Sequence, residues 1–517
     1  MKTDQELYKR LRALSKEELW NAKASRFDAA SPRDRMENVA VIRAVGMIFS
    51  RFGTEEEKRA VREWLMELLH DPQEKIRRYA MTALPKIGGG EGAEAQMLSL
   101  LETCEDREQR HLGRALEKVG GLATLVATKR GISLPSLSEQ KVKAAVMRKE
   151  KPSVVRMQAL LPADPSWKIF LRCRRGLEKI VREEAEELLP KEIFLMGEVK
   201  PGCLTLMPLK PFSLALLYKL RCFATVGFSL GSVSDGDAQW VEKIASTIGS
   251  AKTRTIMLAA TEGAARYRLD FAGRGHQRGT LRQVVDRAYS LSSQILNDAR
   301  EAPWSIDVIP VGLGGSLEAT ARESSLELRP RLYPDPRLFY RRDDIAAASH
   351  PPLAACMARL AFEPDQKVIW DPFCGSGLEL IERSLLGGVI HAYGTDLDPK
   401  AIEVARVNFV AAQLDSTLAE FTCSDFRGAC KTARIQPGSV SLIITNPPLG
   451  RRVRVKDMQG LFADLYAASG RALRSGGRLI FVNPLRSGPS ERFFKLEYRQ
   501  SVDLGGFNCR LELYRKR

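Results

Sequence analysis

The pattern of apolar and polar residues in the last third of the chain alternates between two periods. Short apolar runs, such as KVIWD (367–371), IHAYGTD (390–396) and SVSLIITN (439–446), are separated by longer segments with helical periodicity. Strands that alternate with helices predict a parallel, doubly wound sheet. We therefore expect residues 350–517 to form an α/β domain that binds its ligands at the carboxyl ends of the strands.

Residues 165–330 carry a mixed pattern of strands and helices. WKIFLRC (167–173) and GCLTLMPL (202–209) have the composition of strands, and a charged helical segment lies between them. Further along, ARYRLDFA (265–272) and WSIDVIPVG (304–312) flank a second helical segment, which predicts a strand–helix–strand unit. This middle segment is expected to be an α+β module.

The first 125 residues read as helices with an internal repeat. ALPKIGG (83–89) and ALEKVGG (115–121) recur 32 residues apart, and GMIFSRFG (46–53) is a weaker third copy. A period in this range is typical of an all-α solenoid. The segment resembles HEAT repeats, with an ordinary helical bundle as the alternative. Either architecture offers a surface for a protein partner rather than catalytic chemistry.

Two segments between these regions are predicted to be linkers. Residues 126–164 are rich in Lys and Arg, so they act either as a plain tether or as a strap that binds phosphate. Residues 331–349 overlap RPRLYPDPRLFYRR (329–342), in which arginines alternate with aromatic residues. Such a stretch is suited to stacking on bases, or to packing between two domains as a connection.

Charge and cysteine usage narrow the partners and the compartment. Lys and Arg number 80 against 63 Asp and Glu, and the net charge of +17 favours a polyanion such as nucleic acid, with a solvated basic surface as the alternative. Nine cysteines without a CxxC pair and five histidines without ligand spacing predict a reducing compartment and no metal site. With no apolar run of membrane-spanning length and no signal-peptide pattern, we expect a cytoplasmic protein without membrane contact.

Polar and small residues follow four strands of the predicted α/β domain at the edge where ligands bind. They are Asp371, Phe373, Gly375 and Gly377 after the first strand, Asp396 at the end of the second, Asp425 and Phe426 after the third, and Asn446, Pro447, Pro448 and Leu449 after the fourth. The glycines permit a tight turn, an acid 19 residues past Gly377 suits ribose hydroxyls, and Asp425 with Phe426 suits an adenine. The turn lacks the third glycine of a dinucleotide fingerprint and the lysine of a P-loop, which disfavours a Rossmann oxidoreductase. Together these residues predict a nucleoside site with a second polar corner beside it.

The motifs DPFCGSG, GTDLDP, SDF and NPPLG, in this order, resemble those of class I S-adenosylmethionine-dependent methyltransferases. More narrowly, they resemble the amino-group methyltransferases with an (N/D)PP(Y/F) motif. SHPPLAACMARLA (349–361) and GGFNCRLELYRKR (505–517) are similar to segments of THUMP-bearing RNA methyltransferases that make N2-methylguanosine in tRNA or rRNA.

This resemblance covers about two thirds of the chain and carries several expectations. It implies a Rossmann-like catalytic domain, S-adenosylmethionine as the cofactor, and a ferredoxin-like plus THUMP module over 165–330 that binds structured RNA. It also implies that His350 and Pro351 bind the cofactor, together with Asp371, Phe373, Gly375, Gly377, Asp396, Asp425, Phe426 and Asn446.

The Asn-Pro-Pro corner suits methylation of an exocyclic amine. The Asn446 side-chain oxygen and the Pro447 carbonyl are expected to accept the two N–H groups and direct the lone pair of the amine toward the methyl group, while the prolines keep the corner rigid. The nitrogen becomes acidic only after methyl transfer, so no general base is required. A base in structured RNA has to leave its stack to reach such a corner.

Two positions depart from the family pattern. Leu449 stands where the family has Tyr or Phe stacked on the target base, a contact worth about 1–3 kcal/mol, and Leu378 stands where Thr is frequent. Guanine N2 of tRNA or rRNA is the main hypothesis. The alternatives are a catalytically weakened RNA-binding or assembly factor, an adenine-N6 methyltransferase and a protein glutamine-N5 methyltransferase, the last being disfavoured by the positive charge.

Two groups of arginines are expected to contact the RNA backbone. The first lies in the middle module and comprises Arg266, Arg268, Arg274, Arg278 and Arg282. The second follows the Asn-Pro-Pro corner and comprises Arg451, Arg452 and Arg454. Phosphate contacts are the functional interpretation, and a solvated loop is the alternative for the second group.

Overall fold

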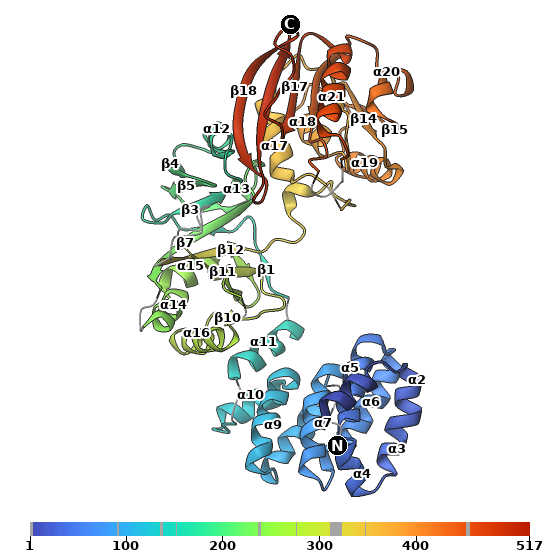
Figure 1. Ribbon diagram of the computed structural model, residues 1–517. Helices are drawn as coiled ribbons and strands as arrows, with labels where there is room; N and C mark the ends of the chain where they lie inside the picture. The colour runs from blue at the N-terminus through green and yellow to red at the C-terminus, as the bar shows by residue number, and fades with distance from the viewer. Residues whose placement is uncertain are drawn as a thin grey trace. The chain divides into compact units, whose positions relative to one another are not determined.

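The computed structural model describes residues 4–89, 92–134, 138–150, 152–235, 239–275, 277–310, 323–346, 348–450 and 455–517. The chain forms two compact units (Figure 1). The first unit combines residues 1–154 with 232–324, and the second combines 155–231 with 325–517. Each unit is therefore assembled from two separate stretches, whereas the sequence pattern suggested a series of consecutive domains.

The amino-terminal part of the first unit is helical, from blue to cyan in Figure 1. Its helices are α1 (Asp4–Leu11), α2 (Lys16–Leu19), α3 (Ser25–Asp28), α4 (Pro32–Glu37), α5 (Ala40–Phe52), α6 (Glu55–Glu67), α7 (Glu74–Ile87), α8 (Ala93–Ser99), α9 (Asp106–Val119), α10 (Leu122–Lys129) and α11 (Glu139–Glu150). The three copies of the internal repeat, GMIFSRFG, ALPKIGG and ALEKVGG, form the final turns of α5, α7 and α9. Each of these helices stops at a glycine of its copy, because glycine is a poor helix former.

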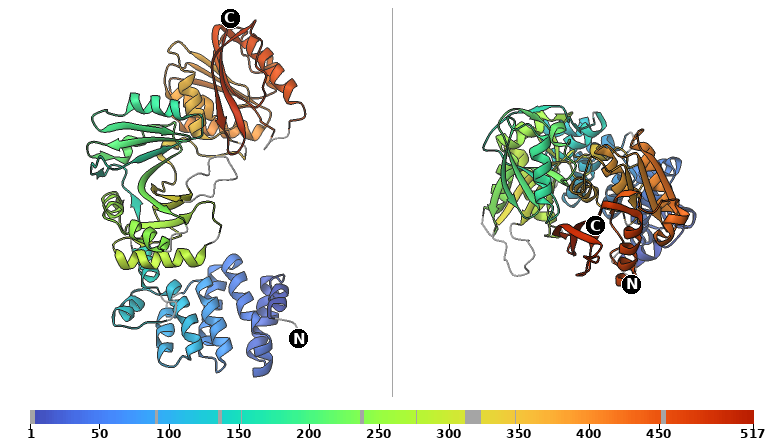
Figure 2. Two further views of the ribbon diagram at one scale, coloured as in Figure 1. Left: turned by 60° about the vertical axis from the view of Figure 1, so that its left-hand side comes forward. Right: turned by 90° about the horizontal axis from the view of Figure 1, so that it is seen from above.

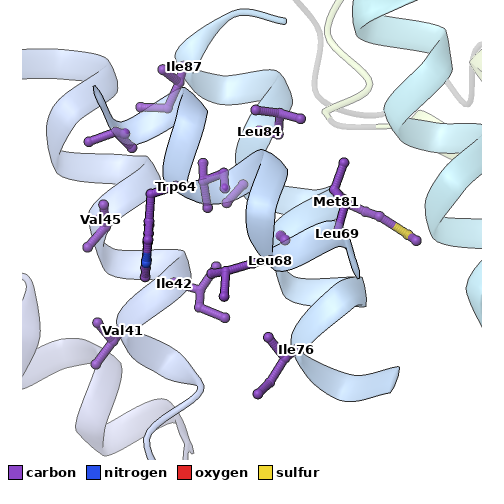
Figure 3. Packing of buried hydrophobic residues seen from close by; sticks show 14 of the residues in the cluster. Val41, Ile42, Val45, Trp64, Leu68, Leu69, Ile76, Met81, Leu84 and Ile87 are labelled. Carbon is purple, nitrogen blue, oxygen red and sulfur yellow. The ribbon is translucent and has the colours of Figure 1, made fainter. Parts of the chain in front are cut away.

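A buried hydrophobic cluster joins the helices of this part (Figure 3). Val45 of α5 is fully buried, and Trp64 of α6 is 7% exposed. Helix α7 packs against both α5 and α9. The contact with α5 is close because Gly46 has no side chain; a Cβ atom there would lie 2.8 Å from the Cβ atom of Ala83.

Residues 126–164, which the sequence suggested to be a basic linker, contain regular structure. Helix α10 runs into this segment and α11 lies within it. Helix α11 packs against α9, and Lys141 forms an ion pair with Glu117 at 2.9 Å. At least this part of the segment is therefore a packed helix rather than an extended tether.

The second stretch of the first unit contains the expected strand–helix–strand unit. Its elements are α14 (Trp240–Ile248), α15 (Ala251–Ala259), β9 (Arg266–Phe271), α16 (Arg278–Leu291), β10 (Leu296–Asn297) and β11 (Trp304–Pro310). Strands β9 and β11 pair in parallel, with Tyr267 opposite Trp304. Helix α16 connects the two strands along the chain and packs against α14, so this prediction is confirmed.

The second unit begins with a run of antiparallel strands that pair in the order β4-β5-β3-β7 and form part of a larger sheet. Its elements are β3 (Ile169–Arg172), α12 (Glu178–Leu188), β4 (Phe194–Lys200), β5 (Cys203–Pro208), α13 (Leu214–Leu217) and β7 (Thr225–Ser234), and β12 (Glu323–Pro330) follows later in the chain. Ile169 lies opposite Leu206 on one side and Phe228 on the other. The two strands and the charged helix expected here are therefore present.

The remainder of the second unit is a seven-stranded α/β domain (Figures 1 and 2). Its elements are α17 (Pro351–Leu360), β13 (Val368–Asp371), α18 (Leu378–Leu385), β14 (His391–Asp396), α19 (Pro399–Ala411), β15 (Leu418–Cys423), α20 (Ala429–Thr432), β16 (Val440–Thr445), α21 (Met458–Ala472), β17 (Leu473–Asn483), β18 (Phe494–Asp503) and β19 (Asn508–Lys516). The strand order is β15-β14-β13-β16-β17-β19-β18. The first five strands in this order are parallel, and β19 pairs antiparallel with β17 and β18. The predicted doubly wound sheet is confirmed.

The centre of this sheet is apolar on both faces. Every residue of β16 is buried, as expected for a central parallel strand. Trp370 and Ile443 lie on the face covered by α21, where they join Phe462 and Leu465 of that helix. Among the described residues, no helix is both long and apolar enough to cross a membrane.

The antiparallel sheet region packs on the α/β domain within the second unit. Arg221 donates to both oxygens of Glu382 on α18, at 2.7 and 2.8 Å. Arg337 donates to the carbonyl of Phe223 at 2.7 Å, and the Cys356 thiol lies 3.7 Å from the carbonyl of Cys222. These contacts are largely shielded from water, and they hold α17 and α18 in place beside the sheet.

Candidate active site

The carboxyl ends of β13 and β16 meet where the strand order reverses. Asp371 is the last residue of β13, and Asn446 follows β16; the two strands pair in parallel through Trp370 and Ile443. Thr445 Oγ1 donates to Asp371 Oδ1 at 2.5 Å. Open α/β sheets bind ligands at this switch point. The structure therefore brings together the first and fourth polar positions that the sequence singled out.

The turn after β13 brings the backbone against the acid at the end of β14. Gly375 and Gly377 have φ values of +50° and +83°, which glycine adopts at no steric cost. The Gly375 N–H donates to Asp396 Oδ2 at 3.0 Å, and the Asp398 N–H donates to Asp396 Oδ1 at 3.0 Å. Two backbone amides thus fix the direction of the Asp396 carboxylate.

Two aromatic rings form an apolar wall next to this turn. The ring centroids of Phe373 and Phe426 are 4.8 Å apart, and Phe426 is 4% exposed. Asp425 accepts from both the N–H and the side chain of Arg427, each at 2.9 Å. Arg427 also reaches Asp464 at 2.6 Å, so it orients the third polar position. Sequence reasoning missed Arg427, although its place two residues after Asp425 was a usable signal.

Asn446 has one satisfied and one unsatisfied side-chain group. Its Nδ2 donates to Ser349 Oγ at 2.9 Å, whereas its Oδ1 is buried without a hydrogen-bond partner among the described residues. Because buried polar groups nearly always have partners, this acceptor marks a place where a ligand donor is missing. Pro447 is buried and Pro448 is half-buried behind it, and their rings restrict the backbone of the corner.

A buried carboxylate explains the orientation of the Asn446 amide. Glu379 on α18 is 3% exposed, and the Ser349 hydroxyl lies close enough to it to lower its pKa. A carboxylate only accepts, so the Ser349 proton is committed to Glu379 and the Ser349 oxygen is left as an acceptor. Asn446 must then offer its NH₂ group to Ser349, which leaves Oδ1 free. Ser349 and Glu379 were absent from the residues expected at the site, since neither follows a strand.

Burial raises the pKa values of the two acids behind this corner. Desolvation raises the pKa of Glu379 to about 7. Desolvation and the nearby charge of Glu379 raise the pKa of Asp371 well above its usual value, despite hydrogen bonds from Thr445 and the Phe373 N–H. The charge state of Glu379 therefore changes near neutral pH.

His350 and Pro351 begin α17 next to Ser349. Pro351 is buried at the first helical position, where its fixed φ suits the helix. Burial and the charges of Arg174, Arg337 and Arg341 lower the pKa of His350 to about 4, so its ring is neutral at physiological pH. Its Nδ1 is buried and without a partner in the part of the chain that the structure describes.

Unsatisfied buried polar atoms gather at this edge of the sheet. Besides Asn446 Oδ1 they are His350 Nδ1, Asp371 Oδ2, Ser376 Oγ, Glu379 Oε1 and Ser424 Oγ. Such a concentration indicates a site built for a polar ligand. A glycine turn without side chains, an oriented acid and an aromatic wall fit the ribose and base of a nucleoside cofactor, so the residues present fit S-adenosylmethionine.

Three comparisons with known proteins agree with this geometry. The family model UPF0020, an RMKL-like methyltransferase domain, matches residues 339–501. The tRNA (guanine(10)-N2)-dimethyltransferase of Methanothermobacter thermautotrophicus is 28% identical over 204 residues, which cover 37% of this chain and 56% of that enzyme. A probable tRNA (guanine(10)-N2)-dimethyltransferase of Methanothermococcus thermolithotrophicus is 26% identical over 134 residues, covering 25% of this chain and 78% of that protein. The crystal structure of TrmN from Thermus thermophilus has 22% identity and a TM-score of 0.52, over 68% of this chain and 100% of that chain, which shows a shared fold.

The fold, the site and the family match define the class: this chain carries an S-adenosylmethionine-dependent methyltransferase domain. S-adenosylmethionine is its cofactor, as expected from the motifs. The two archaeal relatives are named as a tRNA (guanine(10)-N2)-dimethyltransferase and a probable tRNA (guanine(10)-N2)-dimethyltransferase, and the chain spans about half the length of the first of them.

The two departures from the family pattern occupy different surroundings. Leu378 is fully buried at the start of α18, where it contributes to the core of the domain. Leu449 follows the two prolines and is half-buried. Leu449 is therefore the departure that bears on the acceptor side of the site.

The arginines of the middle module have different environments in the first unit. Arg266 is 1% exposed and donates to Asp298 at 3.0 Å, so burial does not fit its expected contact with RNA. Arg274 is held by Asp235 and by Ser324 Oγ.

Two of the other middle-module arginines, Arg268 and Arg278, are exposed on the surface. The third, Arg282, is half-buried and pairs with Glu117 at 3.2 Å. Arg451, Arg452 and Arg454 lie outside the described residues.

Proposed function

We propose that this protein methylates an exocyclic amine of an RNA base, with guanine N2 of tRNA or rRNA as the acceptor. The observation that carries the proposal is the Asn446 side chain, whose Nδ2 is bound by Ser349 while its buried Oδ1 has no partner among the described residues. An exocyclic amine supplies the missing donor. The rigid Pro447-Pro448 backbone adds a second acceptor at a fixed place, the Pro447 carbonyl.

In this mechanism the protein positions the amine and supplies no base for the attack. The lone pair of a purine amine is delocalised into the ring. The nitrogen becomes nucleophilic only when its two N–H bonds are turned out of the ring plane, which frees the lone pair from this conjugation. Asn446 Oδ1 and the Pro447 carbonyl accept the two N–H groups and turn the lone pair toward the cofactor. When bound, S-adenosylmethionine supplies an electrophilic methyl group. Asp396 and the Gly375 turn would hold the ribose of the cofactor, and the Phe373–Phe426 wall would lie against its base.

Three properties support RNA and guanine as the acceptor. The net charge of +17 favours a polyanion over a protein amide. Both archaeal relatives are named for guanine N2 of tRNA. We further propose that residues 165–330 act as the ferredoxin-like and THUMP-like RNA-binding module, and that the amino-terminal helices are HEAT-like repeats.

One observation favours a second candidate function. Leu449 lacks the aromatic face that stacks on the target base in the family, and stacking contributes about 1–3 kcal/mol per base. A protein that lost this contact would bind RNA while transferring methyl groups slowly. This candidate is a catalytically weakened RNA-binding factor.

The deciding experiment measures transfer of labelled methyl groups to a pool of unmodified tRNA and rRNA, followed by nucleoside analysis. We expect label in N2-methylguanosine, lost in Asn446→Ala and retained in the control Asn508→Ala, which changes an exposed asparagine of the same domain. Label in N6-methyladenosine would keep the mechanism and change the base, and label in protein glutamine would replace RNA as the substrate. RNA binding without transfer would select the second candidate.

A further inference from the structure

A group of cations comes from three helices of the first unit that pack against one another, α5, α7 and α9. Helix α7 packs against α5 on one side and against α9 on the other. Four of these cations are exposed, Arg43, Arg110, Arg114 and Lys118, and Lys86 is half-buried; we call these five residues the cationic row. Within the part of the chain that the structure describes, none of the five forms an ion pair, and Arg43 lies over the ring of Tyr8 at 4.3 Å from its centroid.

The members of the cationic row lie close enough to influence one another. Partial burial and the charges of Arg43 and Lys118 lower the pKa of Lys86, which links residues of all three helices. Partial burial and the charges of Arg78, Arg114 and Arg110 lower the pKa of His111, a neighbour of the row on α9. Like charges held together without an intervening anion raise the free energy of the unbound protein.

Two carboxylates of α9 are already paired within the protein. Glu108 is fully buried and pairs with Arg77 at 2.7 Å. Glu117 is buried and pairs with Lys141 at 2.9 Å. Neither acid is therefore available to neutralise the cations of the row.

Helix α6, which packs against both α5 and α7, carries acids and bases together: exposed acids at Glu55, Glu56, Glu63 and Glu67 beside Lys58, Arg59 and Arg62. The cations of α6 therefore lie among acids, and they provide a comparison for the cations of the row.

We infer that the cationic row binds the phosphate backbone of an RNA. Packed helices lie about 8–10 Å apart, so cations on successive helices follow one another at a spacing that a flexible sugar–phosphate chain can match. Arginine and lysine neutralise phosphates without reading the base, which gives affinity and register rather than sequence specificity. The amino-terminal helices are thus a second RNA-binding surface, separate from the methyltransferase site. Only the choice of RNA as the polyanion rests on the proposed function.

The test compares two triple variants of the full chain that lose the same charge. The row variant is Lys86→Gln/Arg114→Gln/Lys118→Gln. The control variant is Arg26→Gln/Arg59→Gln/Arg62→Gln, which removes three cations from α3 and α6. An unmodified tRNA transcript is titrated by fluorescence anisotropy at several KCl concentrations, and thermal unfolding checks that both variants fold; if the row variant unfolds, single variants at positions 114 and 118 replace it.

The salt dependence of binding gives a quantitative expectation. Each phosphate neutralised contributes about 0.7–0.9 to the slope of log K against log salt concentration. The row variant is expected to reduce this slope by about 2–3 and to weaken binding at low salt by about tenfold or more. The control variant should leave the slope nearly unchanged. Equal losses in both variants, or none in the row variant, would overturn the inference.

Two further measurements separate the possible partners and the two proposals. If polyglutamate binds as tightly as RNA, with the same sensitivity to the row variant, the surface serves an acidic protein and the RNA inference is wrong. Asn446→Ala is expected to bind tRNA normally while losing methyl transfer. A wild-type protein that binds tRNA through the row but methylates no RNA would refute the proposed function alone, whereas methylation with unaltered binding in the row variant would refute the row alone.

Discussion

The hydrogen bond between Asn446 and Ser349 should set the rate of methyl transfer, because it decides which end of the Asn446 amide faces the acceptor amine. Nδ2 donates to Ser349 Oγ at 2.9 Å, and the Ser349 hydroxyl is committed to the buried carboxylate of Glu379. Ser349→Ala removes this link. The amide can then rotate and present its NH₂ group, which cannot accept an N–H bond from the substrate.

The size of the effect follows from the strength of one hydrogen bond. A hydrogen bond between neutral groups contributes about 0.5–1.5 kcal/mol net. At 1.36 kcal/mol for each factor of ten in rate, its loss lowers kcat about 2- to 13-fold. We expect little change in the KM for S-adenosylmethionine, because Asp396 and the Gly375 turn are untouched. Ser349→Thr keeps the hydroxyl and should retain most of the activity.

The pH profile supplies a readout that a purely structural role would not change. Burial raises the pKa of Glu379 to about 7. Below that pH the protonated acid can donate to Ser349, which frees the Ser349 proton to bind Asn446 Oδ1 and removes the acceptor. The other titratable groups around Glu379 are Asp371, Cys374 and Glu382. Wild-type kcat should therefore fall as the pH drops through about 7, and Ser349→Ala should lose this acid limb.

The assay is single-turnover methyl transfer to tRNA between pH 6 and pH 9. Ser490→Ala, which changes an exposed serine of the same unit, is the matched control. The reasoning fails if Ser349→Ala keeps both the wild-type rate and the acid limb. It also fails if Ser349→Thr is as impaired as Ser349→Ala, since that result would indicate packing rather than hydrogen bonding.

Three other substitutions test the same site. Glu379→Gln should lower kcat and should raise the melting temperature at pH 8 more than at pH 5. The folded-state pKa of Glu379, about 7, lies above the ordinary 4.5, so the folded chain binds more protons between these pH values and the stability of the wild type falls as the pH rises through that window. Calorimetry at both pH values measures the two shifts in melting temperature, and equal shifts would contradict the expectation. Asp396→Ala removes a carboxylate held by two backbone amides and should weaken S-adenosylmethionine binding about 10- to 100-fold in calorimetric titration, with unchanged affinity arguing against its role at the ribose. Leu449→Tyr restores an aromatic face and should raise kcat/KM for RNA about tenfold or more, since stacking contributes about 1–3 kcal/mol; no gain would mean that another residue already supports the base.

Most of the methyltransferase domain could be predicted from local patterns. The apolar runs that became β13, β14 and β16 are short, rich in β-favouring residues and bounded by turn residues, so neighbouring side chains alone indicate their structure. Paired prolines had to end β16 wherever the strand lay, because they cannot donate to a ladder. Asp371 and Asn446 could be placed at one edge because parallel strands align their carboxyl ends.

Predictions about individual long side chains depended on contacts that no local pattern contains. Arg266 stands in a run of exposed-looking arginines, yet the fold buries it against Asp298, 32 residues away in sequence. The basic segment after residue 126 has the composition of a linker, yet α11 within it is held by an acid of α9. In both cases a distant carboxylate is involved: it pairs with the buried Arg266 in the first case, and in the second it is itself buried and paired with the partly exposed Lys141, because a buried charge is stable only when paired.

The sequence by itself determined the class of chemistry, because backbone freedom at Gly375 and Gly377, strand termination at the prolines and the acids at strand ends are local properties of these residues. Only the tertiary structure decided which groups tune that chemistry. Ser349 lies 97 residues before Asn446, and the cations of α5, α7 and α9 come from three separate helices. Hydrogen bonding, desolvation and charge clustering depend on distances in space, and those distances exist only after the chain has folded.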